Sequence, residues 1–185
     1  MSLDFDNPTD QSVTLRGRLI ARDGDDAEVP DVQINTAFET DKGRAVVTPG
    51  GSVDFVQLRG TGADQVRAIT FEDVEVKQVA GAVLPNPVEL TPVGADGSDL
   101  DDDMDARQVR LDNPNTDSAK VRIVLLVLQA PQGGEPQQAS LIRDVATVEV
   151  KPQASTTVDL DAETQSILQE RGADSFVTLR PVLAP

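Results

Sequence analysis

The chain of 185 residues contains no histidine, cysteine, tryptophan or tyrosine. Histidine is the usual general base near neutral pH and a common metal ligand, while cysteine is the soft nucleophile and the usual ligand of structural zinc. Their absence excludes disulfide bonds, thiol catalysis and the ordinary serine-histidine triad. Only carboxylates, hydroxyls, amides and guanidinium groups remain, so we expect neither an enzyme nor a cofactor site.

Positive charge is also scarce, because 16 Lys and Arg residues stand against 32 Asp and Glu residues, for a formal net charge of -16. Such a surface repels phosphate backbones and anionic lipids, which argues against direct nucleic-acid binding. It also repels itself, except in molar salt, where the Debye length falls to about 3 Å. The composition therefore predicts a halophilic protein, and the alternative is an ordinary acidic mesophilic one.

No long apolar stretch is present. The longest run, residues 123–128, is far shorter than the roughly 20 residues that a membrane-spanning helix needs. The first ten residues, MSLDFDNPTD, lack the basic and apolar regions of a secretory signal. We therefore expect a protein that does not span a membrane and that folds in the cytoplasm where it is made.

What the chain does contain is β-forming sequence, since valine outnumbers leucine and isoleucine together. Alternating apolar residues predict a strand near residues 13–22, with a shift of phase at Gly17 that indicates a bulge. The stretch 119–129, which is almost continuously apolar, predicts a central strand that is either buried on both faces or covered by a partner on the second face. The other predicted strands are 29–39, 44–48, 52–59, 65–79, 88–92, 107–112, 139–150 and 175–183.

One helix is predicted near residues 160–171, with Asp159 or Asp161 as its N-cap, Ile167 and Leu168 facing inward, and Gly172 at its end. Many strands with a single late helix favour an all-β sandwich, and we expect a single jelly roll. The predicted organisation is an extended arm over residues 1–11 and one jelly-roll domain over residues 12–185. No internal repeat is evident in the sequence.

The densest polar cluster is the segment GADGSDLDDDMDAR at residues 94–107. Its candidate cation ligands are Asp99, Asp101, Asp103 and Asp105. The first three imitate a calcium loop, but Met104 replaces the turn glycine and Arg110 replaces the bidentate glutamate. We therefore assign no metal site, and we interpret the segment as a solvated acidic loop that is at most a weak cation binder.

Two further features leave alternatives open. Asp73 and Glu75 would project from one face of a strand, as a glycosidase pair could, but a hydrated sheet face is the simpler interpretation. Phe5 lies beside Leu3 in the otherwise polar first segment. That segment could dock on a neighbouring subunit or along the edge of its own domain.

The whole pattern, from MSLDFDNPTDQSVTLRGRLIARD through KVRIVLLVLQAPQ to SFVTLRPVLAP, resembles the smaller of two major capsid proteins of tailless icosahedral haloarchaeal viruses with an internal membrane. The resemblance implies a single upright jelly roll and a structural role in the virion. It also implies that the chain assembles with itself and a larger related capsid protein into capsomers, beside vertex proteins and proteins of the underlying membrane. The alternatives are a non-catalytic surface-binding β-sandwich of a halophilic cell and an accessory virion component.

Overall fold

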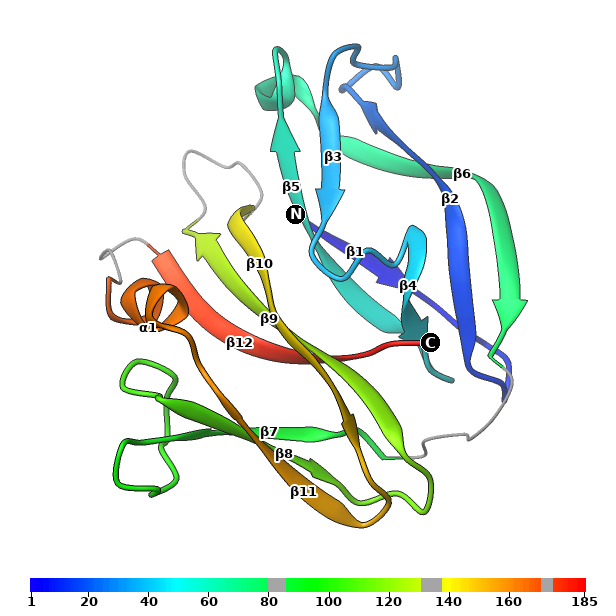
Figure 1. Cartoon of the computed structure of the whole chain (residues 1–185). Coiled ribbons are helices and arrows are strands. Elements are labelled where there is room, and N and C mark those ends of the chain that lie inside the picture. Colours follow the sequence, from blue (N-terminus) through cyan, green and yellow to red (C-terminus); the bar gives the residue numbers. More distant parts are fainter. Residues whose placement is uncertain (80–85, 131–137, 171–174) are drawn as a thin grey trace. The chain divides into compact units, whose positions relative to one another are not determined.

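The computed structural model describes residues 1–79, 86–130, 138–170 and 175–185 (Figure 1). These residues form an all-β protein with one short α-helix, which confirms the predicted class. The elements are β1 (Ser2–Phe5), β2 (Val13–Arg22), β3 (Gln33–Thr36), β4 (Lys42–Val47), β5 (Ser52–Arg59), the 3-10 helix η1 (Ala63–Gln65), β6 (Ala68–Gln78), β7 (Glu89–Val93), β8 (Gln108–Asn113), β9 (Ala119–Gln129), β10 (Ala139–Val150), β11 (Ala154–Asp159), α1 (Ala162–Gln169) and β12 (Ser175–Leu183).

The chain divides into two compact units, each with its own buried apolar cluster. Unit 1 is built mainly from Met1–Val79, and unit 2 mainly from Ala80–Glu135 and Ser140–Ala184. The sequence predicted one domain over residues 12–185 because periodicity identifies strands without showing which strands pair. The predicted arm over residues 1–11 also contains a strand, since β1 forms within it and pairs antiparallel with β5.

Unit 1 consists of two three-stranded antiparallel sheets in the orders β1-β5-β3 and β4-β2-β6. Alternate residues of β5, including Val56 and Leu58, point into a cluster that also takes in Ala21 of β2. Alternation places every second side chain on the same face of a strand. Burial of these residues between the two sheets therefore joins them into a small sandwich.

Unit 2 has the orders β11-β8-β7 and β10-β9-β12, with α1 between β11 and β12 (Figure 1). Its cluster joins Val109 and Leu111 of β8 to Val121 and Ile123 of β9, all of which are fully buried. β9 is the central strand of its sheet and is buried along most of its length, as predicted. Pro92 lies in β7, an edge strand, where its missing N–H leaves no gap in the ladder.

If β7 to β12 are taken as strands A, B, C, C′, E and F, the pairing order in unit 2 is that of an immunoglobulin-like sandwich without strands D and G. A jelly roll instead places eight strands in one two-sheet sandwich. Among the described residues, each sheet of either unit has three strands. The predicted all-β class is therefore confirmed, and the strand pairing does not confirm the predicted jelly roll.

The two units repeat one corner, which the sequence analysis did not detect. We call residues 7–11 and 113–117 the Asn-Pro corners, because each begins with Asn-Pro and follows an aspartate. Asn7 Nδ2 donates to the carbonyls of Gln11, at 2.8 Å, and Val47, at 3.2 Å. Asn113 Nδ2 donates to the carbonyls of Asp117 and Val150 at the same two distances.

The strand pairing around the corners repeats as well. β1 pairs with β5, and β2 pairs with β4 and β6; in the same way β8 pairs with β11, and β9 pairs with β10 and β12. A helix precedes the last strand of each unit, η1 in unit 1 and α1 in unit 2. Outside the corners the corresponding side chains differ, as Gly17 and Ile123 do, so the repeat is visible in the hydrogen bonds and strand pairing and, in the sequence, only at the corners themselves. Each unit also has one strand without a counterpart in the other, β3 in unit 1 and β7 in unit 2.

The predicted irregularity at Gly17 is present, although the extra residues lie in the partner strands. Between Arg16 and Arg18 the opposite strand runs from Glu75 to Glu72, and the register of β4 also shifts next to Arg16. A Cβ at Gly17 would approach Phe71 Cε2 to 2.6 Å and the Glu72 carbonyl oxygen to 2.8 Å. Glycine is therefore required here because the Phe71 ring and the β6 backbone occupy the space of a side chain.

The helix begins where the sequence predicted, and Asp161 rather than Asp159 is its N-cap. Asp161 Oδ1 accepts a hydrogen bond from Thr164 N at 2.7 Å. Leu168 is fully buried and Ile167 is partly buried against the same cluster. The predicted end at Gly172 lies outside the described residues.

Candidate functional site

The four candidate cation ligands of the acidic loop do not converge. Asp99 is bound by Arg110, whose two terminal nitrogens lie 2.6 and 2.9 Å from its carboxylate oxygens. Asp103 Oδ2 accepts a hydrogen bond from Leu179 N of β12 at 3.0 Å, while Asp101 and Asp105 are exposed. Within the described ranges, no group of three or more acidic residues could hold a metal ion.

Carboxylates of this loop accept hydrogen bonds from nearby residues of the chain. Asp96 Oδ1 accepts from Ser98 Oγ at 2.6 Å and from Ser98 N at 3.0 Å, and these bonds lower the pKa of Asp96. The hydrogen bonds from Arg110 likewise lower the pKa of Asp99. A carboxylate that accepts hydrogen bonds in its charged form is stabilised in that form. Asp96 therefore stabilises a turn within the loop, and Asp99 ties the loop to β8.

Among the described residues, the most enclosed carboxylate is that of Asp54 on β5 in unit 1, which the sequence pattern did not single out. It is fully buried and accepts hydrogen bonds from Phe38 N and Phe55 N, both at 2.8 Å, and from Thr40 Oγ1 at 2.8 Å and Thr40 N at 3.2 Å. Burial raises the pKa of Asp54, and the four hydrogen bonds oppose that rise. Its sequence signal is an acid between Val53 and Phe55 within a strand.

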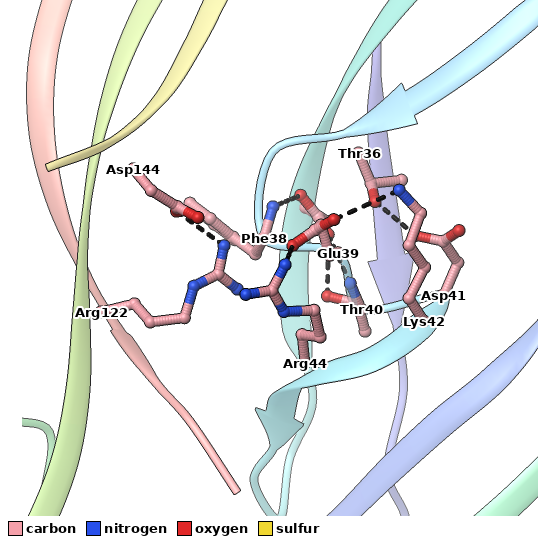
Figure 2. A network of polar contacts seen from close by, with 10 residues as sticks. Thr36, Phe38, Glu39, Thr40, Asp41, Lys42, Arg44, Arg122 and Asp144 are labelled. Carbon is pink, nitrogen blue, oxygen red and sulfur yellow. Dashed lines mark hydrogen bonds and ion pairs between the residues drawn. The ribbon is translucent and has the colours of Figure 1, made fainter. Parts of the chain in front are cut away.

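A second group of polar residues surrounds the turn between β3 and β4 (Figure 2). The Thr36 hydroxyl donates to the buried Asp41 carboxylate. Glu39 has a positive φ of 55° and accepts from Lys42 Nζ at 3.2 Å and Arg44 at 2.6 Å. These contacts bind the acids of the turn to neighbouring donors, so their role is to hold the turn in place.

Figure 2 also shows a charge pair of unit 2, between Arg122 of β9 and Asp144 of β10. One terminal nitrogen of Arg122 lies 2.7 Å from Asp144 Oδ1, and the Arg122 side chain is only 5% exposed. A buried guanidinium needs an anionic or hydrogen-bonding partner to offset the loss of hydration. Asp144 supplies that partner, so the ion pair links two adjacent strands of one sheet.

The carboxylates considered as a glycosidase pair lie at an exposed irregularity of β6. Asp73 has a φ of 52°, and Glu75 lies opposite Arg16 of β2. Both side chains are exposed. Raising the pKa of a catalytic acid takes burial or a close negative neighbour, and the exposure of these residues favours the interpretation as a hydrated sheet face.

Large apolar side chains are exposed on several strands. They are Val53 (47% exposed), Val74 (44%), Val76 (63%) and Phe176 (50%), with Met104 (37%) in the acidic loop. Phe5 is half-buried, and its ring meets that of Phe71 edge to face, with 5.8 Å between centroids. Of the two alternatives for the first segment, this contact favours docking along its own unit.

Comparison with known protein families, with curated proteins and with solved structures gives no match for this chain. No helix in the described part of the chain is long and apolar enough to cross a membrane. Assignment of function therefore depends on the chemistry of the surfaces described above.

Proposed function

We propose that this chain is a non-catalytic structural subunit of a protein shell, which assembles with copies of itself and with a larger related protein in high salt. One observation carries the proposal. Large apolar residues of strands, above all Val74 and Val76, are exposed on a protein whose surface is acidic, because most carboxylates of the described residues are exposed as well. Apolar side chains gain from burial against a neighbour, and the surrounding carboxylates permit close packing only when salt screens them.

The polar clusters support the same proposal. Asp54 and Asp41 accept hydrogen bonds from residues of β3 and of the turn that follows it, and Asp99 is bound by Arg110 of β8, so these carboxylates bind groups of the chain itself. An active site instead needs polar groups directed at a substrate position.

The capsid resemblance, including the larger partner, the vertex proteins, the membrane proteins beneath the shell and the location in the virion, belongs to this proposal. The two-unit organisation differs from a single upright jelly roll, so the proposal depends on surface chemistry rather than on that topology.

A second candidate is a non-catalytic binding module of a halophilic cell surface. The immunoglobulin-like pairing order of unit 2 favours it, because such sandwiches commonly serve as binding modules on cell surfaces. The two candidates differ in whether the chain forms discrete complexes with itself.

Analytical ultracentrifugation of the full chain over a range of concentrations, in dilute and in molar salt, tests the proposal. We expect discrete oligomers in molar salt that dissociate in dilute buffer, where the Debye length is longest. The matched variant D25N/D101N/D105N removes exposed charges and should assemble at lower salt. A chain that stays monomeric at every salt and concentration would contradict the shell proposal and favour the binding module.

A further inference from the structure

The two units differ at one edge, and unit 2 shows how that edge is covered. β8 of unit 2 has two partners, β11 on one side and β7 on the other. The equivalent strand of unit 1, β1, pairs with β5 alone among the described strands. An edge strand presents a row of unpaired backbone N–H and C=O groups, which is a template for a further strand.

In unit 2, β7 does more than extend the sheet. It contacts β12 of the opposite sheet, and Leu90 of β7 joins the buried cluster that includes Val177 and Leu179 of β12. Leu90 lies opposite Leu111 of β8. β7 therefore closes the side of its sandwich between the two sheets.

In unit 1, no described strand covers the corresponding side. When the two units are aligned at their Asn-Pro corners, Phe5 corresponds to Leu111 and Leu15 corresponds to Val121. Val76 of β6 pairs with Leu15, and Leu183 of β12 pairs with Val121. Val76 therefore corresponds to Leu183. Leu183 is partly buried against the cluster of unit 2, whereas Val76 is 63% exposed and Val74, two residues earlier, is 44% exposed. We call the outer edge of β1 together with Val74 and Val76 the open edge.

The charges at the open edge define the chemistry of an occupant. Asp4 and Asp6 of the first segment correspond to Arg110 and Asp112 of unit 2, where Arg110 lies 3.2 Å from Asp112. Unit 1 has an acid in place of that arginine. Among the ion pairs of the described residues none involves Asp4 or Asp6, and both are exposed. A strand placed here meets two uncompensated carboxylates.

We propose that the open edge is a strand-docking site for an extended segment of another polypeptide, with apolar residues at alternate positions and lysine or arginine between them. The backbone of that segment pairs with β1, its apolar side chains cover Val74, Val76 and Phe5, and its cations face Asp4 and Asp6. This is β-strand addition to a sheet edge, in which backbone hydrogen bonds give affinity and alternate side chains give specificity. The inference shares Val74 and Val76 with the proposed function and goes beyond it, because it names the strand edge that pairs with an occupant and the chemistry of that occupant.

The sequence of β7 supplies a probe. A fluorescein-labelled peptide of residues 87–93 carrying Glu89→Lys and Thr91→Lys places Leu90 opposite Phe5 and the two lysines opposite Asp6 and Asp4, if it binds in the register of β7. Fluorescence anisotropy with the full chain gives its affinity, and hydrogen exchange locates it. We expect binding that protects the amides of Ser2–Phe5. The unsubstituted peptide, with Glu89 facing Asp6, should bind more weakly.

Matched variants test the position. V76D places a charge under the docked strand and should weaken peptide binding about tenfold or more. F176D makes the same kind of change at an exposed apolar residue of unit 2 and should leave affinity unchanged. D4N should weaken the lysine peptide about twofold or more and leave the unsubstituted peptide unaffected. The exposure of all three positions keeps the fold intact.

Several results would overturn the proposal. They are absence of binding, equal effects of V76D and F176D, or equal binding of a scrambled peptide with the same charge, which would indicate ionic attraction alone. Concentration-dependent protection of Ser2–Phe5 in the chain without peptide would identify a second copy as the occupant and overturn the basic-partner assignment. Because monomeric protein suffices for the peptide assay, its outcome is separate from that of the assembly experiment.

Discussion

At the residue scale, the Asn-Pro corners show how one side chain can join distant parts of a unit. Asn7 and Asn113 are 5% and 2% exposed, and each uses one amide group to bind backbone carbonyls that belong to different strands or turns. Buried carbonyls without a donor lose their hydration without replacement. The corners therefore fix where the chain passes from one sheet to the other.

We predict that N7A and N113A each lower the free energy of unfolding by about 1–3 kcal/mol, because each leaves buried carbonyl groups without a donor. N113A should have the larger effect, since Asn113 also donates to the Lys151 carbonyl at 3.1 Å. Urea unfolding in molar salt measures both variants. The control N35A, on β3, should stay within about 0.5 kcal/mol of the parent chain. Equal stability of N113A and N35A would contradict the assignment.

Gly17 gives a second prediction at this scale. In G17A the new methyl group meets the Phe71 ring and the backbone of β6, so we expect a loss of about 1–3 kcal/mol of stability. Gly24 has no atom within 4 Å of its would-be Cβ, and G24A should be neutral or slightly stabilising. Thermal unfolding of the two variants under one condition makes the comparison. Equal stability of G17A and G24A would contradict the close packing of Phe71 and the β6 backbone against Gly17.

At the element scale, α1 depends on the charge at its N-terminus. The hydrogen bonds from Thr164, followed by that from Arg143, lower the pKa of Asp161 to about 2, from its usual value of 3.8. Arg143 also contacts Glu163 at 2.6 Å, which links the first turn of the helix to β10. Because the folded pKa lies below the unfolded one, Asp161 contributes stability at pH values above 3.8, and that contribution is lost as the pH falls through about 2.

D161N tests this contribution, because asparagine keeps the capping oxygen and removes the titrating charge. We expect D161N to be less stable than the parent chain near neutral pH, with a difference that shrinks through the acid range and disappears below pH 2. Denaturant unfolding as a function of pH, compared between the two proteins, measures it. A difference that does not change with pH would show that the charge has no role in capping.

At the scale of the whole molecule, the excess of carboxylates controls how stability depends on salt. A net charge of -16 on 185 residues makes the folded chain repel itself more than the expanded unfolded chain does. Screening by salt weakens this repulsion over distances longer than the Debye length. The folded state should therefore gain stability as salt is added.

We predict that the unfolding midpoint of the monomeric chain rises steadily from dilute buffer to molar KCl. Scanning calorimetry at a protein concentration where the chain sediments as a monomer separates this effect from assembly. Sucrose at matched osmolality controls for the exclusion of solutes from the protein surface, because it does not screen charge. The charge-screening explanation fails if the midpoint ignores KCl, or if sucrose produces the same rise.

Much of the secondary structure follows from the sequence alone. The bounds of β5, β9, β10 and β12 are those predicted from alternation and turn residues, and the helix begins at one of the two predicted caps. Two strands were missed. β1 has four residues within an acidic segment, and β11 is a run of small polar residues, so neither has an apolar pattern strong enough to stand out.

The polar sites were less predictable than the strands. The acidic loop attracted attention because its aspartates are adjacent in sequence, yet Arg110 and Leu179 bind two of them from other strands. Asp54 appeared to be one more acid in a strand, although Phe38 and Thr40, far from it in sequence, enclose it. The sequence shows which acidic residues are close together along the chain, whereas their hydrogen-bond partners depend on which strands and turns lie side by side in the fold.

The sequence by itself determined the all-β class, the positions of most strands, the acidic surface and the lack of histidine and cysteine chemistry, because these depend on composition and on short-range periodicity. Only the tertiary structure decided that the strands form two units, that the Asn-Pro corners are equivalent, and that β7 covers in unit 2 an edge with which no described strand pairs in unit 1. The physical reason is that alternation places a side chain on a face, whereas strand order and register arise from long-range pairing, which a local pattern does not encode.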